Sequence, residues 1–270
     1  MKKLFIGIDI SKDKFDYCIL SDDHRILLKG IESNSKKGIS SFCKLINKYS
    51  DLTPWICMEH TGHYGYLLCH EFSNKALTYS MLSPLDLKKS MGLVRGKSDT
   101  VDAYRIASYA LTHQHKLKPS VFPEEALRKL KVTITAREGL KKESVKLQNT
   151  IKAFKIVAKT TDIASVSKVL TKQLEHVKKG IKELEIQMKE IIQLSESLKN
   201  TYKKITGIYG VALITASSVI VETENFTKIT NPRKFACHGG IAPFPYSSGS
   251  SVNGRSRTSI FCKRSLKGLL

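Results

Sequence analysis

Residues 4–20, LFIGIDISKDKFDYCIL, decide the fold, because they combine an apolar strand pattern with a single carboxylate. Residues 4–10 have the composition of a buried strand, and Asp9 is set into it. Removing a carboxylate from water is costly unless a metal or another cation compensates. Asp9 therefore predicts partners, and three candidate carboxylates follow it along the chain: Glu59, Asp99 and Asp102.

Working outward from this stretch, the apolar pattern predicts strands and helices in alternation. The polar cluster SKDKFD is expected to be a turn between the first and second strands. The expected strands are 4–10, 17–20, 25–29, 54–58 and 77–82, and the expected helices are 37–49, 61–72 and 99–111. A meander of three strands followed by alternating helices and strands predicts a mixed α/β domain over residues 1–122.

The charge of the whole chain indicates a polyanionic partner. The 270 residues include 45 Lys and Arg against 24 Asp and Glu, a formal net charge of +21. Nucleic acid is favoured over an anionic membrane surface, and no apolar run approaches the ~20 residues that a membrane span needs. The first ten residues do not form a signal peptide, because Asp9 interrupts the apolar run. The six scattered cysteines lack a CxxC pair, which favours free thiols in a reducing cytoplasm and disfavours a zinc site.

The middle of the chain has the pattern of long helices. Between Glu125 and Lys204 there is no proline, and basic residues outnumber acidic ones by 19 to 9, a net charge of +10. The predicted seam falls in steps of four and three: Leu170, Leu174, Val177, Ile181, Leu184, Met188, Ile191 and then Leu198. This spacing predicts an antiparallel coiled-coil hairpin over residues 123–203, with its basic surface either solvated or in contact with phosphates.

The last segment, residues 204–270, is predicted to be a small, mostly helical domain. It opens with a G-x-x-G turn at residues 207–210, which is either a helix-hairpin-helix that holds a DNA phosphate or a tight packing turn. After Glu224 there is no acidic residue. Eight cations occupy this stretch: Lys228, Arg233, Lys234, Arg255, Arg257, Lys263, Arg264 and Lys267.

The four carboxylates form the first candidate site. Asp99 and Asp102 are three residues apart, so on a helix they share a face and repel each other unless a cation lies between them. Mg²⁺ (or Mn²⁺) prefers such oxygen ligands, and four carboxylates suit two-metal phosphodiester chemistry. Each acid also has an ordinary explanation: Asp9 as a strand-end residue, Glu59 as a charge at a helix entry, and Asp99 as an N-cap.

The second candidate site is the Ser- and Gly-rich stretch 238–259, which is predicted to be a loop. Ser247 and Ser248 precede Gly249, and Arg255 and Arg257 follow them. A serine in a cationic loop can attack a phosphate, while arginines neutralise the charge that develops. A flexible loop without chemistry is the alternative.

These residues together carry a family resemblance that covers the whole chain. GIDISKDKFD, MEHTGHYG and KSDTVDAYRIA match, in order and spacing, the D-E-D-D motif of the DEDD transposases of the one-ten insertion-sequence family, relatives of the Piv-type DNA invertase. FACHGGIAPFPYSSGSSVNGRSR resembles that family's C-terminal transposase domain. The stretch SIFCKRSLKGLL departs from the family pattern, and we expect a C-terminal domain shorter than the family's.

The resemblance implies an RNase H-like, RuvC-type domain, a coiled-coil linker and a transposase domain. Asp9, Glu59, Asp99 and Asp102 would be the metal-binding acids, and Ser248, with Ser247 as second choice, the serine nucleophile. Arg255, Arg257, Lys263 and Arg264 would bind nucleic acid. The implied partners are transposon-end and target DNA, a guide RNA and further copies of the chain in a dimer or tetramer, in the nucleoid of a bacterial cytoplasm.

Three alternatives stay open from the residues. The acids alone can serve a RuvC-like junction nuclease, without a serine step. A shortened transposase can persist as an inactive nucleic-acid-binding protein. A sugar-kinase or actin-like ATPase also begins with a strand that ends in Asp, but it needs glycine-rich phosphate loops that this sequence lacks.

Overall fold

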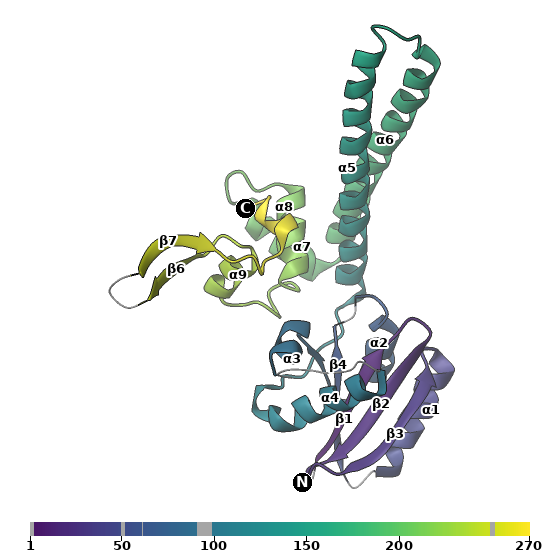
Figure 1. The fold of residues 1–270 in the computed structure, drawn as a ribbon, viewed down its shortest axis with the longest axis vertical. Coiled ribbons are helices and arrows are strands. Elements are labelled where there is room, and N and C mark those ends of the chain that lie inside the picture. Colours follow the sequence, from purple (N-terminus) through teal and green to yellow (C-terminus); the bar gives the residue numbers. More distant parts are fainter. Residues whose placement is uncertain (1–2, 50–51, 61, 91–98, 249–251) are drawn as a thin grey trace. The chain divides into compact units, whose positions relative to one another are not determined.

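The computed structural model describes residues 3–49, 52–60, 62–90, 99–248 and 252–270. The chain forms two compact units, Met1–Phe122 and Pro123–Leu270, and each is considered by itself. Figure 1 shows the strands of the first unit and the long helices of the second.

The first unit is built on a five-stranded mixed sheet. Its strands are β1 (Lys3–Ile10), β2 (Lys14–Ser21), β3 (Ile26–Ser33), β4 (Thr53–Glu59) and β5 (Tyr79–Leu82), in the order β3-β2-β1-β4-β5. β1 pairs antiparallel with β2 and parallel with β4, so it lies at the centre. The predicted meander is confirmed, but the predicted turn SKDKFD is wrong in part, because β2 already begins at Lys14 and places Asp16 within a strand.

Helices cover both faces of this sheet, which explains why β1 and β2 are almost continuously apolar. The helical elements are α1 (Lys36–Ile46), η1 (Asn47–Tyr49), α2 (Tyr66–Asn74), α3 (Pro84–Ser90), α4 (Asp99–Thr112) and η2 (Gln114–Lys116). α1 and α2 bury the face that carries Ile6 and Ile8, with Phe42 and Phe72 at its centre. α4 covers the opposite face, which carries Phe5.

Helix α4 lies unusually close to β1. A Cβ added at Gly7 would lie 2.2 Å from the Ala103 carbonyl oxygen and 2.3 Å from the Ala107 backbone nitrogen. Glycine is therefore the residue that lets the backbones of strand and helix touch. The contact fixes the position of α4 on the sheet.

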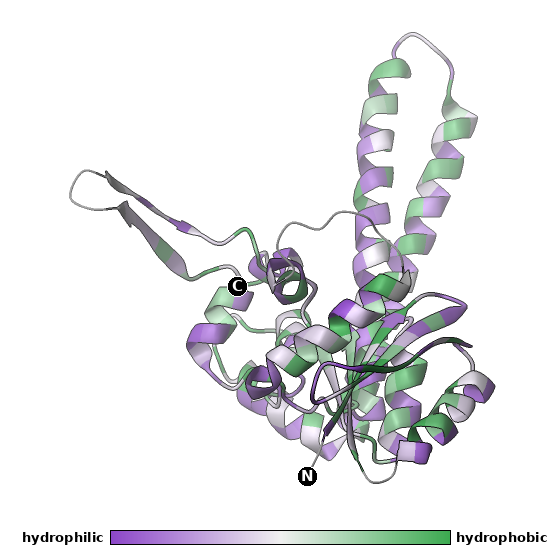
Figure 2. Cartoon of the chain, turned by 60° about the horizontal axis from the view of Figure 1, so that its bottom comes forward, coloured by the Kyte–Doolittle hydropathy of each residue, from purple (hydrophilic) through white to green (hydrophobic). Residues whose placement is uncertain are grey.

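The second unit begins with two long helices, α5 (Glu125–Val157) and α6 (Ala164–Leu194), which lie side by side (Figure 1). They run in opposite directions, because Arg137 contacts Glu185 and a Cβ on Gly180 would meet the Leu140 side chain. Apolar residues recur along both helices between polar ones, as Figure 2 shows. Val177 and Met188 of the predicted seam are buried; knobs-into-holes packing stays a prediction.

A break at Ser195 separates the predicted seam from its last member. The Ser195 hydroxyl accepts a hydrogen bond from the Leu198 backbone N–H at 3.4 Å and caps the next helix, α7 (Glu196–Thr206). Leu198 therefore belongs to α7 and not to α6. It is buried in a core that α5, α6, α7 and the C-terminal elements share.

The remaining elements are short. They are α8 (Leu213–Glu222), α9 (Pro232–His238), β6 (Pro243–Ser248), β7 (Val252–Thr258) and α10 (Arg264–Lys267). The predicted irregular loop is wrong for residues 243–248 and 252–258, which form an antiparallel hairpin. Glycine and serine gather near its turn, and the alternating aromatic residues of β6 give the strand character that composition hides. No helix in the described ranges is long and apolar enough to cross a membrane.

Candidate functional site

Asp9 and Glu59 lie next to each other at the carboxyl ends of two parallel strands. Ile8 pairs with Met58 across β1 and β4, and Asp9 and Glu59 are the next residues on each strand. Parallel neighbours in register point to the same face, with strands about 4.8 Å apart. Both residues are half-buried. Two predicted site residues are therefore held on one rigid edge.

The first turn of α4 is directed to this same edge. The Lys3 ammonium, at the start of β1, donates a hydrogen bond to the Gln114 side-chain oxygen at 3.4 Å, just after α4 ends. The helix therefore runs from the carboxyl end of β1 back toward its beginning. Asp99 and Asp102 lie at the beginning of the helix, on the side of the sheet where Asp9 and Glu59 end their strands.

The structure describes only part of the predicted four-carboxylate cluster. The side chain of Asp99 lies outside the described part of the chain. Asp102 accepts a hydrogen bond from the Arg105 guanidinium at 2.8 Å, and both side chains are largely buried. Within the described ranges, no group of three or more His, Cys, Asp or Glu side chains is arranged to hold a metal ion. Carboxylate oxygens suit a hard cation such as Mg²⁺. The Asp102 carboxylate, however, is already paired with the Arg105 guanidinium of the same helix.

A further acid, Asp16, was missed by the sequence prediction. It lies directly opposite Asp9 in the β1–β2 register, and it is 2% exposed. The Lys14 ammonium contacts its carboxylate at 3.0 Å. Its position in an apolar run, FDYCIL, was the signal that it belongs to a strand and not to a turn.

The predicted serine site lies on the β6–β7 hairpin. Ser247 is exposed and pairs with Asn253, while the backbone of Ser248 pairs with Val252. The side chain of Ser248 and residue Gly249 lie outside the described chain. Arg255 and Arg257 are on β7 and exposed, and neither forms an ion pair with any described residue.

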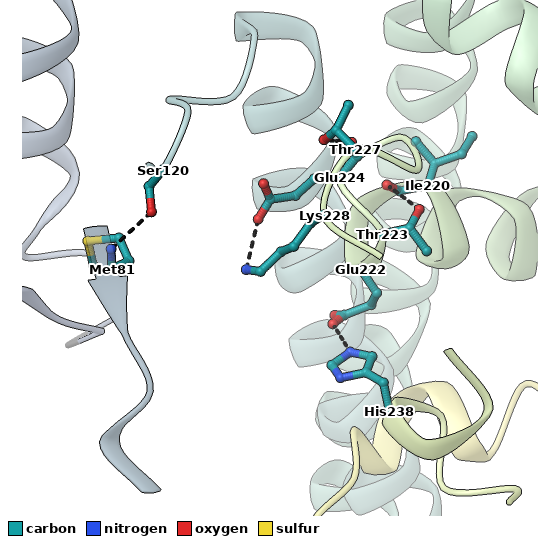
Figure 3. A network of polar contacts seen from close by, with 9 residues as sticks. All are labelled: Met81, Ser120, Ile220, Glu222, Thr223, Glu224, Thr227, Lys228 and His238. Atoms are coloured by element: carbon teal, nitrogen blue, oxygen red, sulfur yellow. Dashed lines mark hydrogen bonds and ion pairs between the residues drawn. The ribbon is translucent and has the colours of Figure 1, made fainter. Parts of the chain in front are cut away.

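The base of this hairpin is tied down by Glu222, at the end of α8. The Glu222 carboxylate contacts the His238 imidazole at 2.9 Å and the Lys263 ammonium at 2.9 Å; Figure 3 shows the His238 contact. Burial raises the pKa of Glu222, but hydrogen bonds from Lys263 and His238 outweigh it and lower that pKa. Lys263, a predicted nucleic-acid contact, thus has a structural partner, whereas Arg264 is exposed.

The G-x-x-G turn joins α7 to α8. Gly207 follows α7 and Gly210 adopts φ +83°, a conformation that favours glycine. α8 begins without a side-chain cap. Beside its first turn, α6 lines a hollow of about 380 Å³ with Lys182, Glu185, Ile186 and Lys189. This hollow contains none of the predicted site residues.

Carboxylates on one sheet edge and a basic, acid-free hairpin segment are the features of a protein that acts on nucleic acid. Two family models match the chain: a DEDD-type IS110 model described as "Transposase" over residues 6–154, and "Transposase IS116/IS110/IS902 family" over residues 202–270. The chain belongs to the IS110 family of transposases, which are DNA-recombination proteins of insertion sequences.

Two characterised relatives are similar over the whole chain. The pilin gene-inverting protein of Moraxella bovis is 25% identical over 278 residues, which covers 100% of this chain and 81% of the relative. The pilin gene-inverting protein of Moraxella lacunata has the same identity and coverage. Both matches cover the first unit, Met1–Phe122, and the second unit, Pro123–Leu270.

Proposed function

We propose that this chain is a DNA transposase that moves an insertion sequence by a metal-dependent acidic site and a serine nucleophile. The observation that supports the proposal is the carboxyl end of β1 and β4, where Asp9 and Glu59 lie on neighbouring parallel strands, with Asp102 in the first turn of α4. The strand order β3-β2-β1-β4-β5, with two parallel pairings, supports the RNase H-like, RuvC-type fold that we assign to residues 1–122.

We assign Asp9, Glu59, Asp99 and Asp102 as the residues that would hold Mg²⁺ or Mn²⁺. When bound, such an ion supplies charge neutralisation at the phosphate and activation of the attacking oxygen. Asp102 contacts Arg105 through Oδ1, so its other carboxylate oxygen, Oδ2, would be the one to join this set. Asp9 and Glu59 are the fixed half of the site, because both stand at the ends of strands.

The serine step is assigned to Ser248, with Ser247 as the alternative. Its hydroxyl oxygen attacks the phosphorus of a DNA phosphodiester, and an oxygen–phosphorus bond forms while the bond to the departing sugar oxygen breaks. Serine loses a proton and the departing oxygen gains one. Arg255 and Arg257 neutralise the charge on the phosphate oxygens, which fits their exposure and their lack of described ion-pair partners.

The remaining parts would bring the nucleic acids and further copies together. We assign residues 123–203 to a coiled-coil linker and residues 204–270 to the transposase domain, which meets transposon-end and target DNA in the bacterial nucleoid. The net charge of +10 between Glu125 and Lys204 supports contact of the helices with phosphates of DNA or a guide RNA. A dimer or tetramer would supply a site for each strand that is exchanged.

A recombination assay on paired transposon ends, with the guide RNA and Mg²⁺ supplied, tests the proposal. Asp9→Asn and Ser248→Ala should each lower product at least about a thousandfold, since each removes a group that reacts or holds the reacting atoms. Asp22→Asn, at an exposed position after β2, and Ser256→Ala, an exposed serine of β7, are the matched controls and should stay active.

The alternatives predict different outcomes in the same assay. If Ser248→Ala keeps activity and Ser247→Ala loses it, the nucleophile is Ser247. If strand cleavage survives loss of both serines but not Asp9→Asn, the protein is a junction nuclease. If no strand is broken under any metal while RNA binding stays tight and salt-sensitive, the chain is a binding protein.

A further inference from the structure

Strand β6 carries two aromatic rings that are largely exposed to solvent. Phe244 is 45% exposed and Tyr246 is 69% exposed. Neither ring contacts another aromatic ring among the described residues. The two rings are two residues apart on β6, a spacing that places side chains on one face of a strand, and the β6–β7 register shifts by one residue between them. Exposed neighbouring apolar groups of this kind mark a binding surface.

The opposite strand adds a cation and a flat surface to this face. Phe244 pairs with Arg257, and Tyr246 pairs with Gly254. A Cβ added at Gly254 would lie 2.7 Å from the Tyr246 ring carbon Cδ1, so one side of the ring rests on the glycine backbone. The other side of the ring is left to solvent. We call Phe244, Tyr246 and Arg257 the aromatic–arginine face.

The surroundings favour a polyanion over a protein as the occupant of this face. No acidic residue occurs after Glu224, so the charge around the hairpin is uniformly positive. A protein that added a strand to β6 would meet Pro243 and Pro245, which lack backbone N–H donors and are typical of protected sheet edges. Charge complementarity therefore points to nucleic acid.

We propose that the aromatic–arginine face stacks the unpaired bases of the DNA strand next to the phosphodiester that is attacked. This inference rests on the proposed function, because Tyr246 precedes the assigned Ser248 by two residues. Aromatic rings bind single strands by stacking on base faces, which a paired and stacked duplex does not offer. Arg257 holds the adjacent phosphate or stacks on a base itself. The DNA at the reacting site is then opened, with its bases turned away from their partners.

Binding to short DNA strands in EDTA tests this inference without any strand chemistry. The full chain is titrated into a single-stranded transposon-end oligonucleotide that carries 2-aminopurine, and into the same sequence as a duplex. Tyr246→Ala should weaken single-strand binding about tenfold, since base–aromatic stacking contributes at that scale. Tyr246→Phe, which keeps the ring, should bind as the unchanged protein does, and Phe244→Ala should fall between the two.

The salt dependence separates stacking from charge. Tyr246→Ala should leave the slope of log affinity against log salt unchanged, whereas Arg257→Gln should reduce that slope by about one. Phe226→Ala is the matched control, because Phe226 is an exposed ring of the same unit that lies outside the hairpin. It should change neither affinity nor slope.

Two results would overturn the inference. One is single-strand binding by Tyr246→Ala and Phe244→Ala that equals that of the unchanged protein. The other is an equal loss on the duplex and on the single strand, because stacking requires unpaired bases. Failure of the serine assignment is distinguishable: Ser248→Ala would then recombine DNA normally, while the binding differences at Tyr246 would persist.

Discussion

The two candidate sites, the carboxylates of the first unit and the serines and arginines of the second, are held by different amounts of structure. Asp9 and Glu59 stand on the central strands of a sheet with helices on both faces, and the α4 backbone touches Gly7 directly. The serines and arginines stand on a two-stranded hairpin whose strands contact chiefly each other. The carboxylates are fixed by a hydrophobic core. The serines and arginines are fixed by the hydrogen bonds of a single strand pair.

A packed sheet holds its side chains at fixed positions, whereas a hairpin on the surface can move. If the carboxylates share a metal as we propose, their spacing must hold to within a fraction of an ångström, which a packed sheet provides. The proposed serine nucleophile would have to approach and leave the DNA, and a hairpin on the surface permits this. The glycines of the two regions make the contrast testable.

Gly7→Ala is expected to have the largest effect. The added Cβ meets backbone atoms of Ala103 and Ala107, which cannot move without displacing α4, so we expect a loss of about 3 kcal/mol or more in the free energy of unfolding of the first unit. Urea unfolding followed by the fluorescence of Trp55, the single tryptophan of the chain, reports on that unit. Unchanged stability would show that α4 is free to shift, and would contradict the tight packing of the first unit.

Gly254→Ala is the counterpart on the hairpin, and Gly139→Ala is the control. At Gly254 the Cβ meets the Tyr246 ring, which can swing away, and the Tyr246 carbonyl oxygen at 3.2 Å, so the loss of stability should be smaller than at Gly7 while Tyr246 loses its support and single-strand binding falls. Gly139 has nothing within 4 Å of an added Cβ and lies within α5, where alanine should stabilise by up to about 1 kcal/mol.

Glu222→Gln should weaken the base of the hairpin by about 1.5 kcal/mol at neutral pH, because hydrogen bonds from Lys263 and His238 to a charged acceptor are lost. The pKa of Glu222 is lowered in the folded protein from an ordinary value of 4.5. Its contribution is therefore complete above that value and is lost as the pH falls through the lower, folded value.

Thermal unfolding at pH 7 and at successively lower pH, followed by circular dichroism, measures this contribution. The gap between the melting temperatures of the unchanged protein and Glu222→Gln should close as the medium becomes acidic. Glu125→Gln is the control: its pKa is also lowered, but the Glu125 side chain is 68% exposed and its ion pair is screened by water. A gap that stays constant with pH would refute the assignment.

Arg137→Met should cost about 1 kcal/mol, less than Gly7→Ala or Glu222→Gln. It tests whether α5 and α6 have a packed contact comparable to that between α4 and the sheet. The Arg137 guanidinium contacts the Glu185 carboxylate at 2.7 Å between α5 and α6, with side chains that are 16% and 32% exposed. Lys129→Met removes an exposed pair with Glu125 and should cost about 0.3 kcal/mol. Equal losses from chemical unfolding would show that Arg137 contributes no more than a surface pair.

The order of elements in the first unit was predictable because strands that are buried on both faces are long apolar runs. Such runs are easily identified in a sequence. Asp9 stood out for the same reason, as a charge in an apolar run. Asp16 did not, because it lies at the border between the polar cluster SKDKFD and the apolar run YCIL, and the prediction assigned it to the turn. The pairing of Asp102 with Arg105 was equally hidden, since helix spacing permits it without requiring it.

The hairpin was missed because its composition conceals its pattern. Glycine and serine in SSGSS indicate irregular backbone, but the rings of Phe244 and Tyr246 alternate as strand residues do. Strand β6 also contains two prolines, which are rare in paired strands and tolerated at edges. Both strands of a two-stranded hairpin are edge strands, so the prolines are tolerated in β6.

The β6–β7 hairpin is expected to open and close on a time scale typical of two-stranded ribbons. A two-stranded ribbon with little other support is marginally stable in water, and such ribbons form and open within about 1–10 μs. The serine would then be displayed in its strand geometry for only part of the time until DNA fills the adjoining face. The first bond would be broken at a rate set by how often the ribbon is closed, so a crosslink across β6 and β7 would accelerate the reaction without changing any reacting group.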